Sequence, residues 1–184
     1  ALFVIIIFIV TFSASDSMAS PHTPNPLLSP TPPVSIPFLI NEYYQDIDDL
    51  DLVSIFPHHP EYFSRFDKLY SDWMDKLKDV DFNSLDVSDR VDFILLKRNI
   101  QNDTYDLKQD EKDYLQYSYA LPFADNIVAL QQKRRRGQRP DAMATAKAFN
   151  EIQLQIDKAK SVVTKTPLPD KHLLNKTIEA LEEL

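Results

Sequence analysis

The sequence predicts an all-α fold, an antiparallel array of about six helices around one long central helix. The 184-residue chain contains a single Gly, and tight β-turns depend on Gly for positive φ angles. Apolar residues recur at spacings of three and four from residue 36 onward, the period of an amphipathic helix. The longest such segment, residues 86–123, carries one apolar stripe: Phe93, Leu96, Ile100, Thr104, Leu107, Tyr114 and Ser118.

This long segment is predicted to be the centre of the array. Asp86, with Asp89 three residues later, is a plausible N-cap, and Pro122 ends the helix. A second apolar face over the first turns consists of Val91, Ile94 and Leu95. A helix that is apolar on two sides is expected to be covered on both.

The N-terminal residues predict a signal segment and a linker. Residues 2–12 are almost wholly apolar, are too few to span a bilayer, and are followed by small residues. We therefore interpret residues 1–20 as a cleaved secretory signal, and the alternative is an uncleaved anchor. Residues 21–35 are a Pro-rich linker, with an SH3-type ligand as the weaker alternative. Residues 36–184 are then the N-terminal part of a helical domain, truncated at its C-terminus, in a secreted or extracytoplasmic protein.

The other helices follow from periodicity and from their ends. Pro60 suits the first turn of a second helix, and Gly137 ends a short fourth helix whose last turn is cationic. The residues expected to be buried on the first helix are Ile36, Leu39, Tyr43, Ile47 and Leu50, and those on the second are Tyr62, Phe66, Leu69, Trp73, Leu77 and Val80. On the fifth helix they are Ala142, Ala146, Phe149, Ile152, Ile156, Ala159 and Val163. On the sixth they are Leu174, Ile178, Leu181 and Leu184. The last four are expected to remain partly exposed and to favour association.

Composition excludes several functions. The net charge of −8 disfavours nucleic acid and anionic membrane surfaces as partners. A membrane partner is expected only if the N-terminal segment is an uncleaved anchor. The sequence has no Cys, which excludes thiol catalysis, disulfides and Cys-based zinc sites.

Two groups of metal-type residues do not match a known ligand spacing. His58, His59 and Glu61 lack the His-to-His spacing of a zinc helix, and Pro60 interrupts them. An EF-hand loop starting at Asp46 would need Gly and Glu where Asp51 and Pro57 stand. We therefore predict no metal ligand, no cofactor and no catalytic residue within this chain.

The basic run Lys133, Arg134, Arg135 and Arg136 has four possible uses. It could complement the dipole of the preceding helix, pair with acidic neighbours, be cleaved by a processing protease, or bind a polyanion. Two sequons, at Asn102 and Asn175, are possible glycosylation sites. A crowd of tyrosines on the long helix could line a groove or pack in the core, and core packing is favoured: Tyr105, Tyr114, Tyr117 and Tyr119.

Three motifs resemble one protein family. The segment RVDFILLKRN (Arg90–Asn99) resembles the start of a long helix in the family known as domain of unknown function eight-eight-five. The segment LPF (Leu121–Phe123) resembles the break that follows this helix in the family. Arg134–Arg136, with Pro140–Ala142, resemble the family's arginine-rich stretch before P-D-A. The helix of Trp73 and the residues DFNSL (Asp81–Leu85) fit as well. The resemblance covers about residues 36–184.

The resemblance implies a largely helical protein, secreted or lipid-anchored, of the zinc metallopeptidase class. Its metal motif, similar to HExxH, would lie downstream of this chain, with zinc held by two His and a carboxylate and a Glu activating the bound water. The expected function is thus an N-terminal helical scaffold of a peptidase that acts on peptide substrates. The alternative is a non-enzymatic helical interaction module on a Pro-rich stalk.

Overall fold

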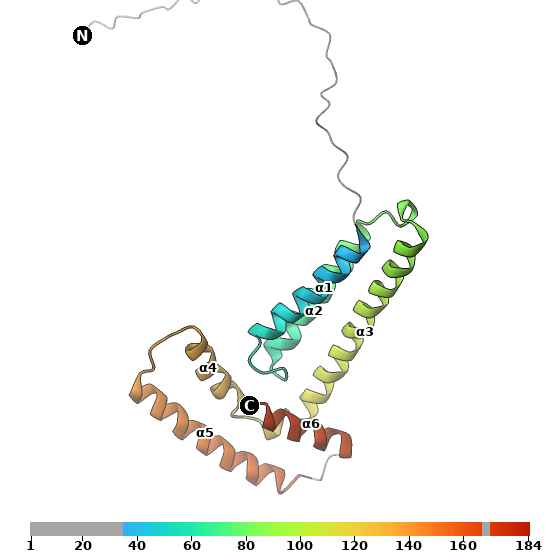
Figure 1. Ribbon diagram of the computed structural model, residues 1–184. Helices are drawn as coiled ribbons and strands as arrows, with labels where there is room; N and C mark the ends of the chain where they lie inside the picture. Colours follow the sequence, from blue (N-terminus) through green and yellow to red (C-terminus); the bar gives the residue numbers. More distant parts are fainter. Residues whose placement is uncertain (1–34, 167–169) are drawn as a thin grey trace, which may run out of the picture. The chain divides into compact units, whose positions relative to one another are not determined.

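The computed structural model describes residues 35–166 and 170–184. The predicted signal segment, and all of the predicted linker except Ser35, lie outside the described residues. Six α-helices and two short 3-10 helices, with no strand, make up the described ranges, which confirms the all-α prediction (Figure 1). They are α1 (Ile36–Val53), α2 (Pro60–Lys78), η1 (Phe82–Ser84), α3 (Val87–Tyr117), η2 (Ser118–Ala120), α4 (Ala124–Arg135), α5 (Ala142–Val163) and α6 (Lys171–Glu182).

Three helix ends lie where local signals predict them, whereas α3 ends at Tyr117, before the predicted stop at Pro122, and the chain continues as the 3-10 helix η2. Asp86 caps α3 by accepting a hydrogen bond from the backbone N–H of Asp89 at 2.8 Å. Pro60 is the first residue of α2, and His59 is its N-cap. Gly137 adopts φ +65° after α4, and its N–H donates to the carbonyl of Arg134 at 3.0 Å.

The long helix α3 is the common neighbour of α1, α2, α6 and η2 (Figure 1). Its stripe residues Leu96, Ile100, Leu107 and Tyr114 are buried, as predicted. A polar link adds to this packing, since the Tyr43 hydroxyl of α1 donates to Asp103 Oδ2 at 2.5 Å. Burial, and then the Asp103 carboxylate, hold the pKa of Tyr43 well above its ordinary value, so this phenol remains a donor.

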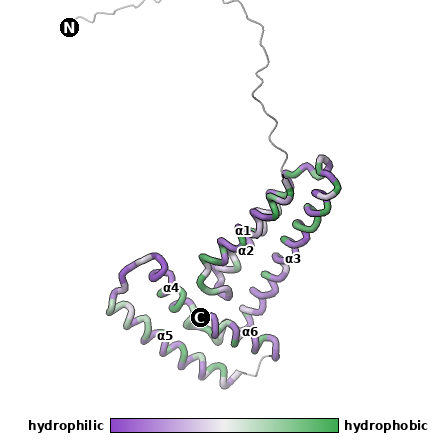
Figure 2. The backbone as a smooth tube through the Cα atoms, in the orientation of Figure 1, coloured by the Kyte–Doolittle hydropathy of each residue, from purple (hydrophilic) through white to green (hydrophobic). Residues whose placement is uncertain are grey.

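The second apolar face of α3 is not covered, which corrects the prediction. Val91, Ile94 and Leu95 are 52%, 55% and 53% exposed. Both α1 and α2 pack against the stripe side, and no element in the described ranges lies over the other side. Figure 2 shows the apolar residues of α3 concentrated in this first half, whereas its second half is mainly polar.

The buried faces of the other helices match the predictions in part. In α2 the buried side is rotated, since Phe63 and Tyr70 are buried while Tyr62 and Leu69 are half-buried. Val80, expected on this helix, lies beyond its end at Lys78 and is half-buried. In α5, of the seven positions expected to be buried, Ile152 and Ala159 are buried. In α6, the three positions Leu174, Ile178 and Leu181 are 39%, 46% and 47% exposed, in line with the expected exposed apolar surface.

Candidate functional site

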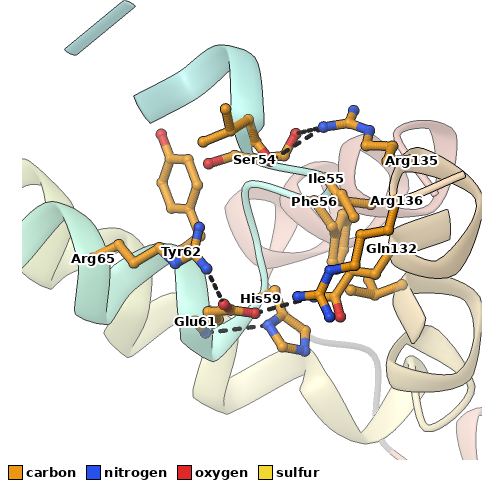
Figure 3. A pocket seen from close by; sticks show the side chains of 12 residues that line it. Ser54, Ile55, Phe56, His59, Glu61, Tyr62, Arg65, Gln132, Arg135 and Arg136 are labelled. Carbon is orange, nitrogen blue, oxygen red and sulfur yellow. Dashed lines mark hydrogen bonds and ion pairs between the residues drawn. The ribbon is translucent and has the colours of Figure 1, made fainter. Parts of the chain in front are cut away.

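The connection between α1 and α2 meets α4 around a hollow of about 150 Å³ (Figure 3). Phe56 anchors this connection because its ring is 2% exposed and lies 5.3 Å from the His58 ring. Pro57 and Pro60 restrict the backbone on either side of the two histidines, which fixes the entry into α2. The hollow therefore lies beside a connection whose backbone is restricted by two prolines.

Glu61 is the centre of the polar contacts in this hollow. Its carboxylate accepts hydrogen bonds from Arg65, one turn later on α2, and from Gln132 Nε2 of α4 at 3.2 Å. Its backbone N–H donates to His59 Nδ1 at 3.2 Å, and His59 Nε2 lies 3.3 Å from Asp125 Oδ1. These contacts, drawn in part in Figure 3, tie the start of α2 to α4.

Arg135 from the predicted basic run crosses to the C-terminal end of α1. Its Nη1 donates to the carbonyls of Leu52, Val53 and Ser54 at 3.4, 3.1 and 2.9 Å. The last carbonyls of a helix lack partners within the helix and carry its partial negative charge. Arg135 thus complements the dipole of α1, while Lys133, Arg134 and Arg135 also lie in the last turn of α4. Lys133, Arg134 and Arg136 are exposed, and their cleavage or polyanion binding stays a prediction.

Replacing Arg135 by Ala is expected to lower the free energy of unfolding by about 1–2 kcal/mol, because a cationic donor is removed from three carbonyls. Lys133→Ala, an exposed position on the same helix, is the matched control and should change it by less than about 0.5 kcal/mol. Urea unfolding followed by circular dichroism measures both. Equal effects of the two variants would contradict the role of Arg135.

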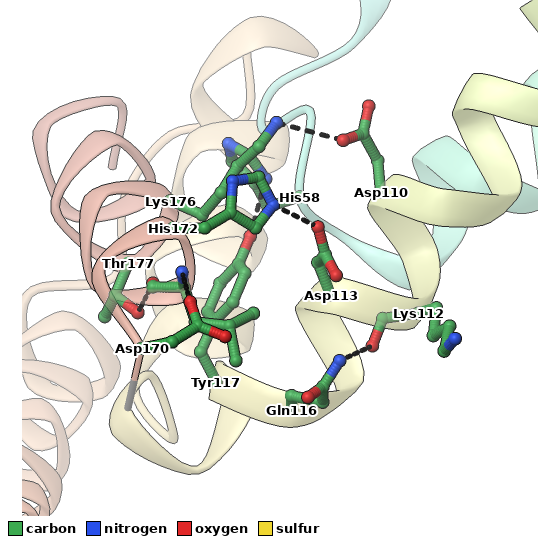
Figure 4. Close-up of polar contacts among 11 residues, drawn as sticks. His58, Asp110, Lys112, Asp113, Gln116, Tyr117, Asp170, His172, Lys176 and Thr177 are labelled. Atoms are coloured by element: carbon green, nitrogen blue, oxygen red, sulfur yellow. Dashed lines mark hydrogen bonds and ion pairs between the residues drawn. The ribbon is translucent and has the colours of Figure 1, made fainter. Parts of the chain in front are cut away.

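A polar seam joins α6 to α3 and to the α1–α2 connection. It consists of one ion pair, Lys176 Nζ with Asp110 Oδ1 at 2.9 Å, and two contacts of a histidine ring with a carboxylate: His172 Nε2 with Asp113 Oδ2 at 2.8 Å and His58 Nε2 with Glu183 Oε2 at 3.3 Å. His58 Nδ1 also lies 2.8 Å from the Tyr117 hydroxyl. Figure 4 shows the contacts of His172, Lys176 and His58 converging on α3.

Sequence reasoning missed the seam, although one signal for it was present. His172 and Lys176 are one turn apart on α6, and Asp110 and Asp113 are one turn apart on α3. A His and a Lys on one helix and two Asp residues on another, each pair at helical spacing, indicate polar sides that face each other. Nothing in the local sequence links His58 to Tyr117, which lies 59 positions away.

His58 gives the fold a dependence on pH. Burial lowers its pKa below the ordinary value of 6.5, and Lys176 adds to this effect, while Glu183, Asp110 and Glu179 oppose it. Unfolding restores the ordinary pKa, so below about pH 6.5 the unfolded chain binds more protons than the folded one. The stabilisation by neutral His58 is therefore present above that pH and is lost as the pH falls through the folded pKa.

The free energy of unfolding is expected to fall more steeply between about pH 7 and about pH 5.5 in the parent chain than in His58→Gln. One proton can change the slope by no more than about 1.4 kcal/mol per pH unit. Urea unfolding at several pH values measures the two slopes, and the comparison cancels the other histidines. Parallel pH profiles would show that His58 does not titrate differently in the folded state.

The two histidines at the α1–α2 connection do not form a joint site. His58 faces α3 and α6, whereas His59 faces the start of α2 and Asp125 of α4. In the described ranges no three His, Asp or Glu side chains are grouped as metal ligands would be. The hollow and the seam hold helices together, and this is the role that their hydrogen bonds support.

The remaining predicted residues are separate from this site. Asn102 on α3 and Asn175 on α6 are both exposed, so either could carry a glycan without displacing a neighbour. Of the four tyrosines, Tyr114 and Tyr117 are buried, as core packing predicts, while Tyr105 and Tyr119 are 64% and 38% exposed. No described helix combines the length and apolar character that a membrane span requires.

The described residues form an all-helical fold whose helices are joined by polar contacts. No family model matches it, and no curated protein and no solved structure matches it either. The resemblance to the domain of unknown function eight-eight-five family therefore stays a prediction.

Proposed function

We propose that these helices are the N-terminal scaffold of a secreted zinc metallopeptidase that acts on peptides, with its zinc ligands outside residues 1–184. The proposal rests on the family resemblance of three motifs. It is supported by one observation, that each of the three motifs contributes at least one residue to a joint between helices.

The first motif joins η1 to α3. Arg90 Nη2 donates to the carbonyl of Asn83 at 2.7 Å, and its guanidinium lies 5.6 Å from the centre of the Phe82 ring. These contacts fix the direction in which the chain enters the long helix.

The second and third motifs form the joints that follow. Leu121 and Phe123, at 3% and 8% exposure, fill the bend between α3 and α4. Arg135 caps α1, and Asp141 caps α5 by accepting hydrogen bonds from the N–H groups of Met143 and Ala144 at 2.9 and 3.1 Å. Motif residues with structural roles suit a scaffold whose chemistry is supplied by other residues.

The proposal has two tests. The purified 184-residue chain is expected to hydrolyse no peptide in a mixed peptide library and to contain no stoichiometric zinc by mass spectrometry. A longer reading frame of the same transcript is expected to encode an HExxH motif, and the longer protein should hydrolyse peptides in a zinc-dependent manner.

Three results would overturn the proposal. They are peptide hydrolysis by the 184-residue chain, tight stoichiometric zinc bound by it, or a reading frame that stops soon after Leu184 without the motif. The last result would favour the helical interaction module.

A further inference from the structure

One side of α5 carries an apolar stripe along most of the helix. Its residues follow a three–four spacing, and we call them the α5 stripe: Phe149, Ile152, Ile156, Ala159 and Val163. Its ends remain accessible, since Phe149 is 59% and Val163 is 44% exposed. From Phe149 to Val163 the stripe is roughly 21 Å long.

Two apolar hollows lie along the α5 stripe. The first, of about 360 Å³, is lined by Phe149 and Ile152 of α5 together with Ile127, Leu130, Gln131 and Arg134 of α4. The second, of about 420 Å³, lies between α5 and α6 and includes Ile156, Val163 and Ile178 in its lining. When two helices pack face to face, the apolar side chains of one helix fit into hollows along the other. The two hollows along the α5 stripe are suited to side chains of such a helix.

The walls of the second hollow offer few polar groups to a ligand. The hydroxyls of Thr164, Thr166 and Thr177 donate to backbone carbonyls, those of Lys160, Val162 and Leu173, at 3.0, 2.9 and 2.7 Å. The backbone of a helix interior is likewise hydrogen-bonded within the helix. An extended peptide would leave its own backbone groups unpaired here, whereas a helix would not.

The charges of the two hollows have one sign. Arg134 is the one charged residue in the lining of the first hollow, and Lys160 is the one in that of the second. Neither side chain forms an ion pair within the described ranges. The two cations also disfavour a second copy docking through the same face, since antiparallel stripes would bring like charges together.

We propose that the α5 stripe is a docking surface for an acidic amphipathic helix. The apolar side of that helix would fill the two hollows at a three–four spacing, and carboxylates beside it would pair with Arg134 and Lys160. The inference is independent of the proposed peptidase scaffold.

The test uses fluorescein-labelled probe peptides of about three heptads. The acidic probe carries Leu at its a and d positions and Glu at e and g. One control probe carries Lys in place of Glu, and another has the Leu positions scrambled. Fluorescence anisotropy with the full 184-residue chain is expected to show saturable binding of the acidic probe, at least about tenfold tighter than either control.

Matched variants of the chain locate the binding. Phe149→Ser combined with Val163→Ser is expected to weaken binding by at least about tenfold. Leu154→Ser, on the opposite side of the same helix and 65% exposed, should leave binding unchanged. Arg134→Glu combined with Lys160→Glu should reverse the preference from the acidic to the Lys-bearing probe. Circular dichroism checks that each variant is folded.

Four results would overturn the proposal. They are no saturable binding of the acidic probe, equal binding of both charged probes, equal weakening by Leu154→Ser and by the double serine variant, and self-association of the chain that the double serine variant abolishes. The last would identify the face as a contact between copies.

Discussion

Trp73→Ala is expected to lower the free energy of unfolding by about 3–5 kcal/mol, because it removes a large buried ring from the core. The side chain is 3% exposed and packs edge-on against Tyr43, with ring centres 5.5 Å apart. Its indole N–H donates to Asp46 Oδ2 at 2.9 Å. The alanine variant therefore leaves a cavity between α1 and α2 and removes a donor from a carboxylate. Urea unfolding followed by circular dichroism is the suitable measurement, since the chain has one Trp and the variant loses its fluorescence.

Two control variants should lose less stability than Trp73→Ala. Leu52→Ala, at a position on α1 that is 77% exposed, should change the free energy of unfolding by less than about 0.5 kcal/mol. Trp73→Phe should fall between the two, because it keeps part of the ring packing and loses the hydrogen bond. A loss of less than about 1 kcal/mol for Trp73→Ala would mean that α1 and α2 do not share this core in solution.

The second large effect is expected for Ile100→Ala, which should cost about 2–5 kcal/mol. Ile100 is 0% exposed at the centre of the α3 stripe. Ile94→Ala removes the same atoms from the same helix at a position that is 55% exposed, so it should cost less than about 1 kcal/mol. The difference between the two unfolding free energies tests which side of α3 is covered.

An equal cost for the two isoleucines would contradict the structure. It would mean that Val91, Ile94 and Leu95 are covered in solution, as the double-sided apolar pattern predicts. Chemical labelling of the exposed face, compared between the parent chain and Ile94→Ala, would then identify the covering element.

Helix ends were predictable because their signals are local. Asp86 satisfies a backbone N–H three residues away, Pro60 has the φ angle of a first turn, and Gly137 tolerates a positive φ. Each of these effects depends on a few neighbouring residues. A sequence therefore shows them without knowledge of the fold.

The covering of apolar faces was harder to predict for a physical reason. Periodicity shows that one side of a helix is apolar, but not which element packs against it. The second face of α3 and the two ends of the α5 stripe have the pattern of buried surfaces and remain accessible, whereas Ile152 and Ala159 within the stripe are buried. The exposed fraction of each side chain therefore shows which apolar faces are covered, and the sequence pattern alone does not.

The candidate site was predictable only in its composition. The basic run was recognised, and helix-dipole complementation was among its expected uses. Its true partner, the end of α1, lies more than eighty positions earlier, and the choice of Arg135 over its three neighbours depends on how α4 approaches α1. The pair of His58 and Tyr117 likewise depends on the path of the chain between them.

The unusual ratio of one Gly to thirteen Pro has a consequence for the denatured ensemble. In the described ranges Pro37 and Pro60 lie in first helical turns, and Pro57, Pro122 and Pro140 lie in connections. Each ring removes backbone freedom before folding begins, in a conformation that the native chain also adopts. Folding therefore costs less chain entropy than it would for a glycine-rich sequence of equal length. This smaller entropy cost offsets part of the stabilisation that is lost because the helices leave apolar surface in water.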